Sequence, residues 1–320
     1  MHLLTQWSPP YPKRPNNGLV RTLPLMGTFV TIHVVGDGEL SGCRKAEESV
    51  ERAFGWFHQV EQCCTRFDPE SEIMQLARHA GEAVPVSTIL YEVVQFALAI
   101  AQASGGAFDP TVGYAMETRG FNRNYVSGSA VRTAVDSTAG VSYRDVHLAP
   151  DRQTVTLLRP LILDLGAVAK GLAVDLAARE LQPFENFAIN AGGDLYLGGK
   201  NPHAERWLIG VRHPQRNDEL IDSLRISNLA VCTSGDHERR GAHDSKEHHI
   251  LDPRTGSSAN VAASVTVIAS NAMLADALAT AAFVLGPVEG IQLLERYGVD
   301  GLILCPKLER FATRGLCAYY

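Results

Sequence analysis

The sequence has few of the features that mark membrane or nucleic-acid-binding proteins. No apolar run approaches the roughly 18 residues that a transmembrane helix needs, so no membrane span is predicted. The formal net charge is −6 and no basic block occurs, which argues against a nucleic-acid partner. The first ten residues contain neither a basic segment nor a long apolar one, so they do not have the pattern of a signal peptide.

A thiolate metal site is also disfavoured, because no two cysteines stand in a C-x-x-C pattern. The six cysteines are Cys43, Cys63, Cys64, Cys232, Cys305 and Cys317. We interpret them as reduced thiols and expect a cytoplasmic protein, or a periplasmic one if the sequence is incomplete at its start.

The chain has 320 residues, of which 45% are hydrophobic and 20% charged, as is ordinary for a globular protein with a sizeable core. Residues 1–20 contain four prolines and are predicted to form an extended arm, and residues 21–320 to form a single domain. Expected strands fall into hairpins with helices between the groups. This order favours an α+β fold with mixed or antiparallel sheets over a doubly wound parallel sheet.

The most distinctive predicted element is a helix over residues 272–285. Its composition is apolar on all sides, which is typical of a buried helix, and Asn271 or Ser270 is suited to cap it. Asp276 and Thr280 interrupt the apolar run, and a spacing of four residues places them on one side of the helix, one turn apart.

A carboxylate on such a helix is costly unless it is paired or holds a metal ion. Asp276 and the Thr280 hydroxyl offer hard oxygen ligands, which suit magnesium or calcium better than zinc or copper. The alternative is a core carboxylate that accepts a backbone amide hydrogen or pairs with a buried arginine. The helix alone leaves both interpretations open.

Periodicity and turn residues predict the remaining elements. Helices are expected at about 41–64, 88–104, 131–138, 172–181 and 288–297. Strands are expected at 28–35, 146–149, 154–158, 162–165, 187–199 with a glycine break, 207–212, 229–233, 247–251, 264–269 and 301–305, with a short closing strand within 311–320. The strands at 207–212 and 229–233 are expected to continue one sheet.

Two of the segments raise chemical possibilities. A strand at 162–165, the glycine turn that begins at Gly166, and a helix N-terminus would expose backbone N–H groups that can seat a phosphate, although a plain strand-to-helix turn explains the same pattern. In a strand at 247–251, the neighbouring side chains of His248 and His249 would point to opposite faces, so only one of them would face a site.

Taken together, the segments resemble a known family. Their order and spacing are similar to those of the ApbE family, the FAD:protein FMN transferases, over about residues 22–310. The segments that carry the resemblance are Met26–Thr28, Phe108–Gly113, Asp164–Gly171, Asn190–Asp194, Thr233–Asp236, His249–Gly256 and Ala275–Thr280. Residues 114–121 depart from the apolar, tryptophan-containing segment that many members have there.

The resemblance implies an ApbE-like, T-fold-like architecture with two lobes and a flavin site in the cleft between them. It also implies a magnesium-dependent enzyme that cuts the pyrophosphate of FAD and transfers FMN to a threonine or serine hydroxyl of an acceptor flavoprotein, releasing AMP. Two alternatives stay open: hydrolysis of FAD to FMN and AMP, and flavin binding without turnover.

The family's functional residues are carried over by position. The resemblance implies a magnesium site formed by Asp276, Thr280 and the main-chain oxygen of Ala169. It implies flavin contacts at Met26, Asp109, Gly166, Leu172 and Ile250. His249 is implied as the base that takes the acceptor's proton, and His249 and Asp276 are the expected catalytic residues. An imidazole suits this task because histidine titrates near neutral pH.

Overall fold

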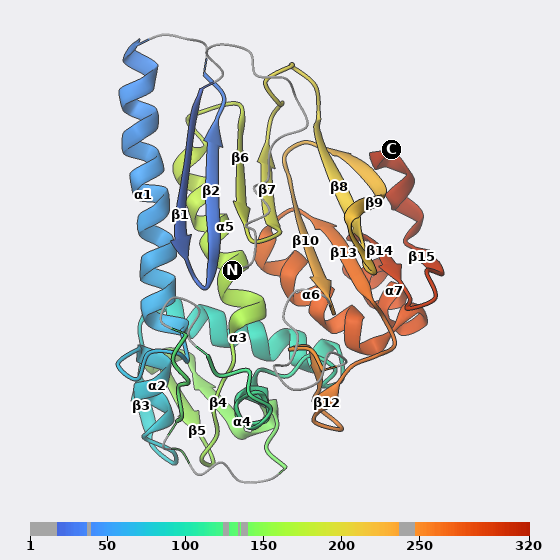
Figure 1. Cartoon of the computed structure of the whole chain (residues 1–320). Coiled ribbons are helices and arrows are strands. Elements are labelled where there is room, and N and C mark those ends of the chain that lie inside the picture. Colours follow the sequence, from blue (N-terminus) through green and yellow to red (C-terminus); the bar gives the residue numbers. More distant parts are fainter. Residues whose placement is uncertain (1–17, 37–39, 124–127, 134, 136–139, 237–246) are drawn as a thin grey trace.

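A computed structural model describes residues 18–36, 40–123, 128–133, 135, 140–236 and 247–320. Its centre is an eight-stranded sheet in which all neighbouring strands run antiparallel (Figure 1). The strands, in spatial order, are β1 (Leu19–Leu25), β2 (Thr28–Val34), β6 (Phe187–Ala191), β7 (Asp194–Gly198), β10 (Leu229–Gly235), β13 (Ser264–Ala269), β14 (Asp300–Leu304) and β15 (Arg310–Ala312). The predicted α+β class with antiparallel pairing is confirmed.

Helices cover one face of this sheet, and a two-stranded ribbon covers part of the other (Figure 1). The helices are α1 (Leu40–Cys64), α5 (Gly166–Leu181), α6 (Ala272–Leu285) and α7 (Pro287–Arg296). The ribbon consists of β8 (Trp207–His213) and β9 (Arg216–Ile226), and it packs with the 3-10 helix η4 (Arg314–Tyr319). Alternate residues of the strands therefore enter two separate apolar clusters, as a sheet buried on both faces requires.

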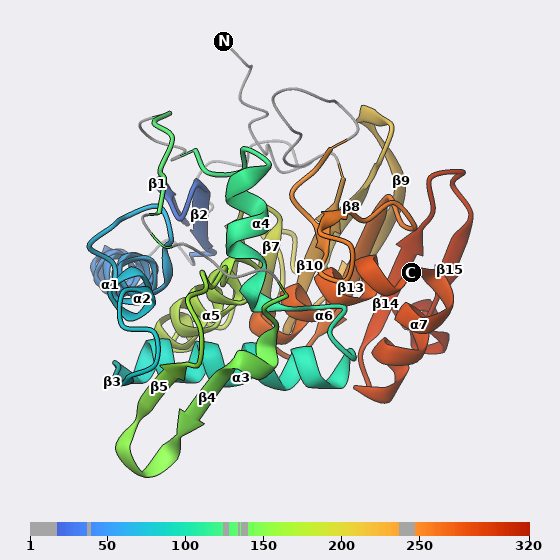
Figure 2. The same cartoon turned by 90° about the horizontal axis from the view of Figure 1, so that it is seen from below.

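A smaller group of elements lies at one end of the helical layer, where α3 contacts both α5 and α6 (Figures 1 and 2). It contains α2 (Glu72–Ala77), α3 (Thr88–Ala103), the 3-10 helix η1 (Pro110–Val112), α4 (Gly113–Thr118), η2 (Tyr143–Asp145) and η3 (Pro150–Arg152). It also contains β3 (Ala83–Pro85), β4 (Val146–Ala149) and β5 (Thr154–Leu157), paired in the order β3-β5-β4. A separate hairpin joins β11 (Leu251–Asp252) to β12 (Ser257–Ser258).

Caps account for two of the correctly predicted helices. Ser87 accepts a hydrogen bond from the Leu90 amide at the start of α3, and Asn271 accepts one from the Leu274 amide at the start of α6. Of the arm expected over residues 1–20, residues 1–17 lie outside the described part of the chain, and Leu19 and Val20 belong to β1.

Several expected elements are wrong. Residues 162–165 form no strand, because their main chain bonds to a turn: the Gly113 amide donates to Ile162 O and the Asp164 amide donates to Pro110 O. The helix expected at 172–181 already begins at Gly166. Strand β8 does not continue the main sheet but pairs with β9, an element the periodicity did not predict. Residues 131–133 and 135 are not helical, and the rest of the helix expected at 131–138 lies outside the described residues.

One further expectation fails, and another is met only in part. Residues 247–250 contain an isolated bridge at most, so no strand covers 247–251. The short closing strand expected within 311–320 is present as β15, but it ends at Ala312, and the rest of that segment is the 3-10 helix η4. Among the described residues, no helix is both long and apolar enough to cross a bilayer. The described cysteines, Cys63, Cys64, Cys232, Cys305 and Cys317, are free thiols.

Helices α5 and α6 are fixed to each other by a close backbone approach and a shared cap. A Cβ atom placed on Gly171 of α5 would lie 2.5 Å from Met273 Cα and 2.6 Å from Ala272 O of α6. One turn further along α5, Asp175 accepts hydrogen bonds from the Ala272 and Met273 amides at 2.6 and 2.9 Å. The α5 carboxylate thus satisfies free N–H groups in the first turn of α6.

Replacing Gly171 by alanine should therefore lower the free energy of unfolding by about 1–3 kcal/mol, because backbone atoms of α6 must move to admit the methyl group. Gly55→Ala is the matched control. Gly55 is also helical, but nothing lies within 4 Å of an added Cβ there. This change should stabilise the protein by about 0.5–1 kcal/mol. Chemical denaturation of both variants tests the contrast, and equal effects would exclude the close approach.

Candidate active site at the crossing of α5 and α6

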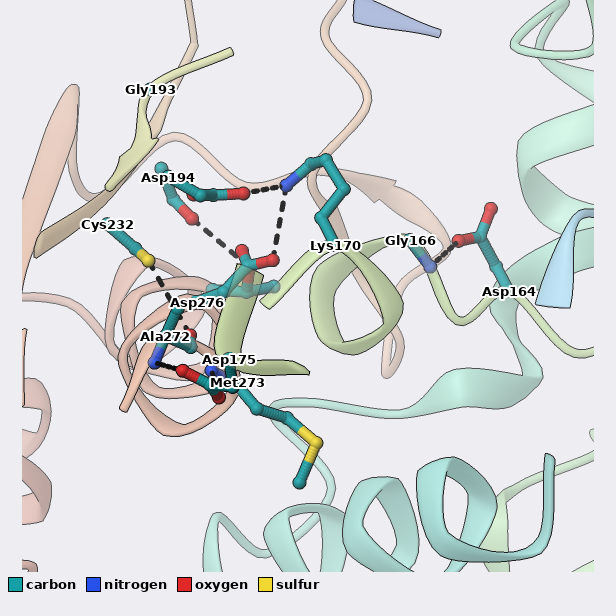
Figure 3. A network of polar contacts seen from close by, with 12 residues as sticks. Asp164, Gly166, Lys170, Asp175, Gly193, Asp194, Cys232, Ala272, Met273 and Asp276 are labelled. Atoms are coloured by element: carbon teal, nitrogen blue, oxygen red, sulfur yellow. Dashed lines mark hydrogen bonds and ion pairs between the residues drawn. The ribbon is translucent and has the colours of Figure 1, made fainter. Parts of the chain in front are cut away.

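Asp276 is buried in α6 and is paired with a lysine of α5. The Lys170 ammonium lies 3.1 Å from Asp276 Oδ2 and also donates to Asp194 Oδ2, the first residue of β7 (Figure 3). Both carboxylates are nearly inaccessible, with 5% of Asp276 and 3% of Asp194 exposed. The sequence predicted that Asp276 needs a partner, but it did not identify Lys170 or Asp194.

The cluster contains two carboxyl groups and one ammonium group. Burial and the nearby charge of Asp194 raise the pKa of Asp276 above its ordinary value. Burial alone would lower the pKa of Lys170, but the attraction of Asp194 and Asp276 outweighs it and holds that pKa above its usual range. Lys170 is therefore charged at neutral pH, and the two carboxylates can accept further positive charge.

Asp194 is positioned by a glycine turn that packs against a second turn. Gly192 and Gly193 link β6 to β7 with φ angles of 66° and 106°, a conformation that glycine adopts readily. A Cβ on Gly192 would lie 2.3 Å from the Thr28 Oγ1 atom at the start of β2. The paired glycines thus make a two-residue hairpin turn that approaches Thr28 closely, and Asp194 directly follows this turn.

The N-terminus of α5 is occupied by the chain's own carboxylate. The Gly166 amide donates to Asp164 Oδ1 at 2.9 Å, and Asp164 Oδ2 accepts from Arg66 Nε at 2.6 Å. Arg66 is 5% exposed, and its guanidinium also donates to Phe121 O. The Gly166 amide is therefore already bonded within the chain, to an aspartate two residues earlier.

Asp109 has a structural task. Its carboxylate accepts hydrogen bonds from the Thr111 amide, the Thr111 hydroxyl and the Tyr143 amide at 2.9, 2.7 and 3.0 Å. It therefore caps the 3-10 helix η1 and ties it to η2. Burial raises the pKa of Asp109, and these hydrogen bonds oppose the shift.

The two adjacent histidines have different environments. His248 is buried, its Nε2 lies 2.6 Å from Ala259 O, and its ring meets the Phe283 ring edge-on at 5.6 Å between centroids. His249 is partly exposed, and Ile250 is buried again. His248 therefore holds the loop against α6, although the strand geometry expected to separate the pair is absent.

Oxygen atoms suited to a hard cation are present at the helix crossing. Thr280 lies one turn after Asp276 and its Oγ1 is 3.1 Å from Ser234 Oγ, while buried Ala169 directly precedes Lys170. Within the described ranges, no three or more His, Cys, Asp or Glu side chains form a metal-binding group. A magnesium ion is nonetheless compatible, because it commonly takes one or two carboxylates and completes its shell with water and substrate phosphates.

Cys232 is close to this cluster but is unsuited to it as a ligand. Its thiol is buried and donates to Ala272 O at 3.5 Å, and burial together with the neighbouring carboxylates raises its pKa. A thiol binds metal as the thiolate. Oxygen ligands therefore remain the relevant donors here.

The predicted flavin contacts Met26, Asp109, Gly166, Leu172 and Ile250 do not line the pocket found among the described residues. Leu172 and Ile250 are buried, and Met26 is partly buried with a φ of 50° in its turn. An open pocket of about 300 Å³ lies between the β11–β12 loop and Val284 of α6. Lys170, Asp194 and Asp276 do not line this pocket.

The antiparallel α+β fold has known counterparts. The sequence profile of the ApbE family matches residues 26–303, so the chain belongs to the ApbE family. It is 33% identical over 296 residues to the FAD:protein FMN transferase of Treponema pallidum, covering 84% of this chain and 80% of that protein.

Solved structures agree with this assignment. The ApbE protein of Thermotoga maritima matches with a TM-score of 0.81 and 30% identity, covering 94% of this chain and 98% of that one. Flavin transferase ApbE from Vibrio cholerae matches with a TM-score of 0.79 and 26% identity, covering 94% of this chain and 99% of that one.

The buried Arg66–Asp164 pair generates a stability prediction. Arg66→Met should lower the free energy of unfolding by about 3–5 kcal/mol, because it leaves a mostly buried carboxylate without its counter-ion. Arg44→Met is the control: Arg44 pairs with Glu48 on the surface of α1, with 86% of its side chain exposed. Its loss should change stability by less than about 1 kcal/mol. Similar effects of the two changes in denaturant titrations would contradict a structural pair at Arg66.

Proposed function

We propose that this protein, a flavin transferase by its family, uses magnesium to transfer the FMN part of FAD to a threonine or serine hydroxyl of an acceptor flavoprotein, releasing AMP. The observation that carries the proposal is Asp276, a buried carboxylate with a hydroxyl one turn away and an ammonium group against it. The name FAD:protein FMN transferase, shared by relatives from several bacteria, supports the same reaction.

The reaction balances without an additional reagent. The acceptor oxygen forms a bond to the phosphorus on the FMN side of the pyrophosphate, and the bond from that phosphorus to the bridging oxygen breaks. AMP leaves with the bridging oxygen, and the acceptor's hydroxyl proton passes to His249. A partly exposed imidazole on a loop anchored by the buried His248 suits this task.

The residues at the helix crossing have complementary roles in this proposal. Asp276, Thr280 and the Ala169 carbonyl would hold magnesium, whose chemistry there is to neutralise charge on the pyrophosphate oxygens. Met26, Leu172 and Ile250 would contact the flavin. Gly166 and Asp109 would orient it through the turns they hold, since their polar groups are already bonded within the chain.

The direct test incubates the protein with FAD, magnesium and candidate acceptors, and measures AMP and covalently bound flavin. We expect equal amounts of AMP and flavin-labelled acceptor. AMP release without labelled acceptor would indicate hydrolysis, and FAD binding without AMP would indicate a flavin carrier. Either result, with an acceptor that a related transferase labels, would contradict the proposal.

Asp276→Ala should abolish magnesium-dependent AMP release, because a methyl group cannot hold a hard cation. The fold should persist, since Lys170 keeps Asp194 as a partner. Asp151→Ala is the control, because Asp151 is exposed in η3. Magnesium-dependent turnover at the unmodified rate in Asp276→Ala would remove Asp276 from the metal site.

His249→Ala should lower the transfer rate by roughly 10² to 10⁴, the usual scale of general base catalysis, while FAD affinity changes little. His58→Ala, an exposed change on α1, is the activity control. His248→Ala should instead lower the thermal unfolding temperature, because it removes a buried contact with Ala259 O. Normal transfer by folded His249→Ala would mean that another group takes the proton.

A further inference from the structure

The Lys170 ammonium contacts both buried carboxyl groups of the cluster. Asp194 projects from β7 and Asp276 from α6, and the two carboxyl groups contact each other (Figure 3). Among the described residues, Lys170 is the cation that forms ion pairs with both. Two touching carboxylates cannot both ionise without a counter-charge, so this ammonium stabilises the cluster in the absence of a metal ion.

We propose that Lys170 is an internal counter-ion that competes with a divalent cation for Asp194 and Asp276, and that Asp194 becomes part of the cation's site when Lys170 withdraws. The inference rests on the proposed function, which places magnesium at Asp276, and assigns roles to two residues that the function leaves unused.

The charges of the cluster favour this exchange. With both carboxylates ionised, Asp194, Asp276 and Lys170 sum to −1. Binding of a divalent cation beside a stationary ammonium would change the sum to +1 within a buried site, which is unfavourable unless a new anion arrives. The side chain of Lys170 is 22% exposed, compared with 4% for Asp194 and 7% for Asp276, so it is the member with a route outward.

The position of Lys170 would also let its ammonium pair with a bound anion after it leaves the carboxylates. Lys170 is in the second turn of α5 and directly follows Ala169, a proposed metal ligand. A lysine side chain is a flexible stem with a point charge, which can leave one anion and reach another nearby. The FAD pyrophosphate carries two negative charges, so the displaced ammonium can pair with it. The cation and FAD should therefore bind cooperatively.

The test measures the dissociation constant of Mn²⁺ by calorimetry without FAD, and then with FAD present. Lys170→Gln and Lys170→Met should bind Mn²⁺ alone at least about tenfold more tightly than the unmodified protein, because a close charge pair can change affinity by that much or more. Lys170→Arg keeps the competing charge and should show no such gain. In the two neutral variants, FAD should improve Mn²⁺ affinity less than in the unmodified protein.

Lys170→Gln is included because it should remain folded even if Lys170→Met does not. The glutamine amide can still donate hydrogen bonds to the two carboxylates. Asp194→Asn should weaken Mn²⁺ binding. Equal or weaker Mn²⁺ affinity in both neutral variants, or unchanged affinity in Asp194→Asn, would overturn the inference. Asp276→Ala distinguishes failure of the proposed metal site from failure of this inference. If Asp276→Ala binds Mn²⁺ as tightly as the unmodified protein does, the proposed metal site is wrong. If Asp276→Ala loses Mn²⁺ affinity but the Lys170 and Asp194 variants do not change as expected, only the roles of Lys170 and Asp194 are wrong.

Discussion

The close contact between α5 and α6 is the constraint on which the site depends. Gly171 lets the backbones of the two helices touch, and Asp175 of α5 caps the first turn of α6. This contact fixes the rotation and height of one helix against the other. As a result, Lys170 faces Asp276 across the helix crossing, and a hard-oxygen site is formed from residues far apart in the sequence.

The sheet adds the third charged residue through turn geometry. The Gly192–Gly193 turn packs against Thr28 and directs Asp194 toward α5 and α6. Three elements therefore contribute one charge each to a buried cluster. The desolvation cost of these charges is offset by the attraction of Lys170 to both carboxylates. A site of this kind is sensitive to any added cation or anion, which suits a protein whose proposed substrate is a pyrophosphate used with magnesium.

The sequence predicted some parts of this arrangement for clear physical reasons. Residues 272–285 are apolar on all sides, so both the helix and the need of Asp276 for a positive partner could be inferred. The identity of that partner could not, because Lys170 lies 106 residues away and only the packing of α5 on α6 joins them. The segment at 162–165, apolar except for Asp164, indicated a strand, but its main-chain hydrogen bonds go to the turn after Asp109. Likewise, no local pattern distinguishes His248, which is held by Ala259 O, from His249.

The proposed mechanism depends on a divalent cation at the crossing of α5 and α6. Crystals grown with FAD and Mn²⁺, measured for anomalous scattering from manganese, test it most directly. We expect a manganese peak within coordination distance of a carboxylate oxygen of Asp276, Oγ1 of Thr280 and the Ala169 carbonyl, with Lys170 Nζ turned away from Asp276. A manganese peak elsewhere, with the Lys170–Asp276 ion pair intact beside bound FAD, would contradict it.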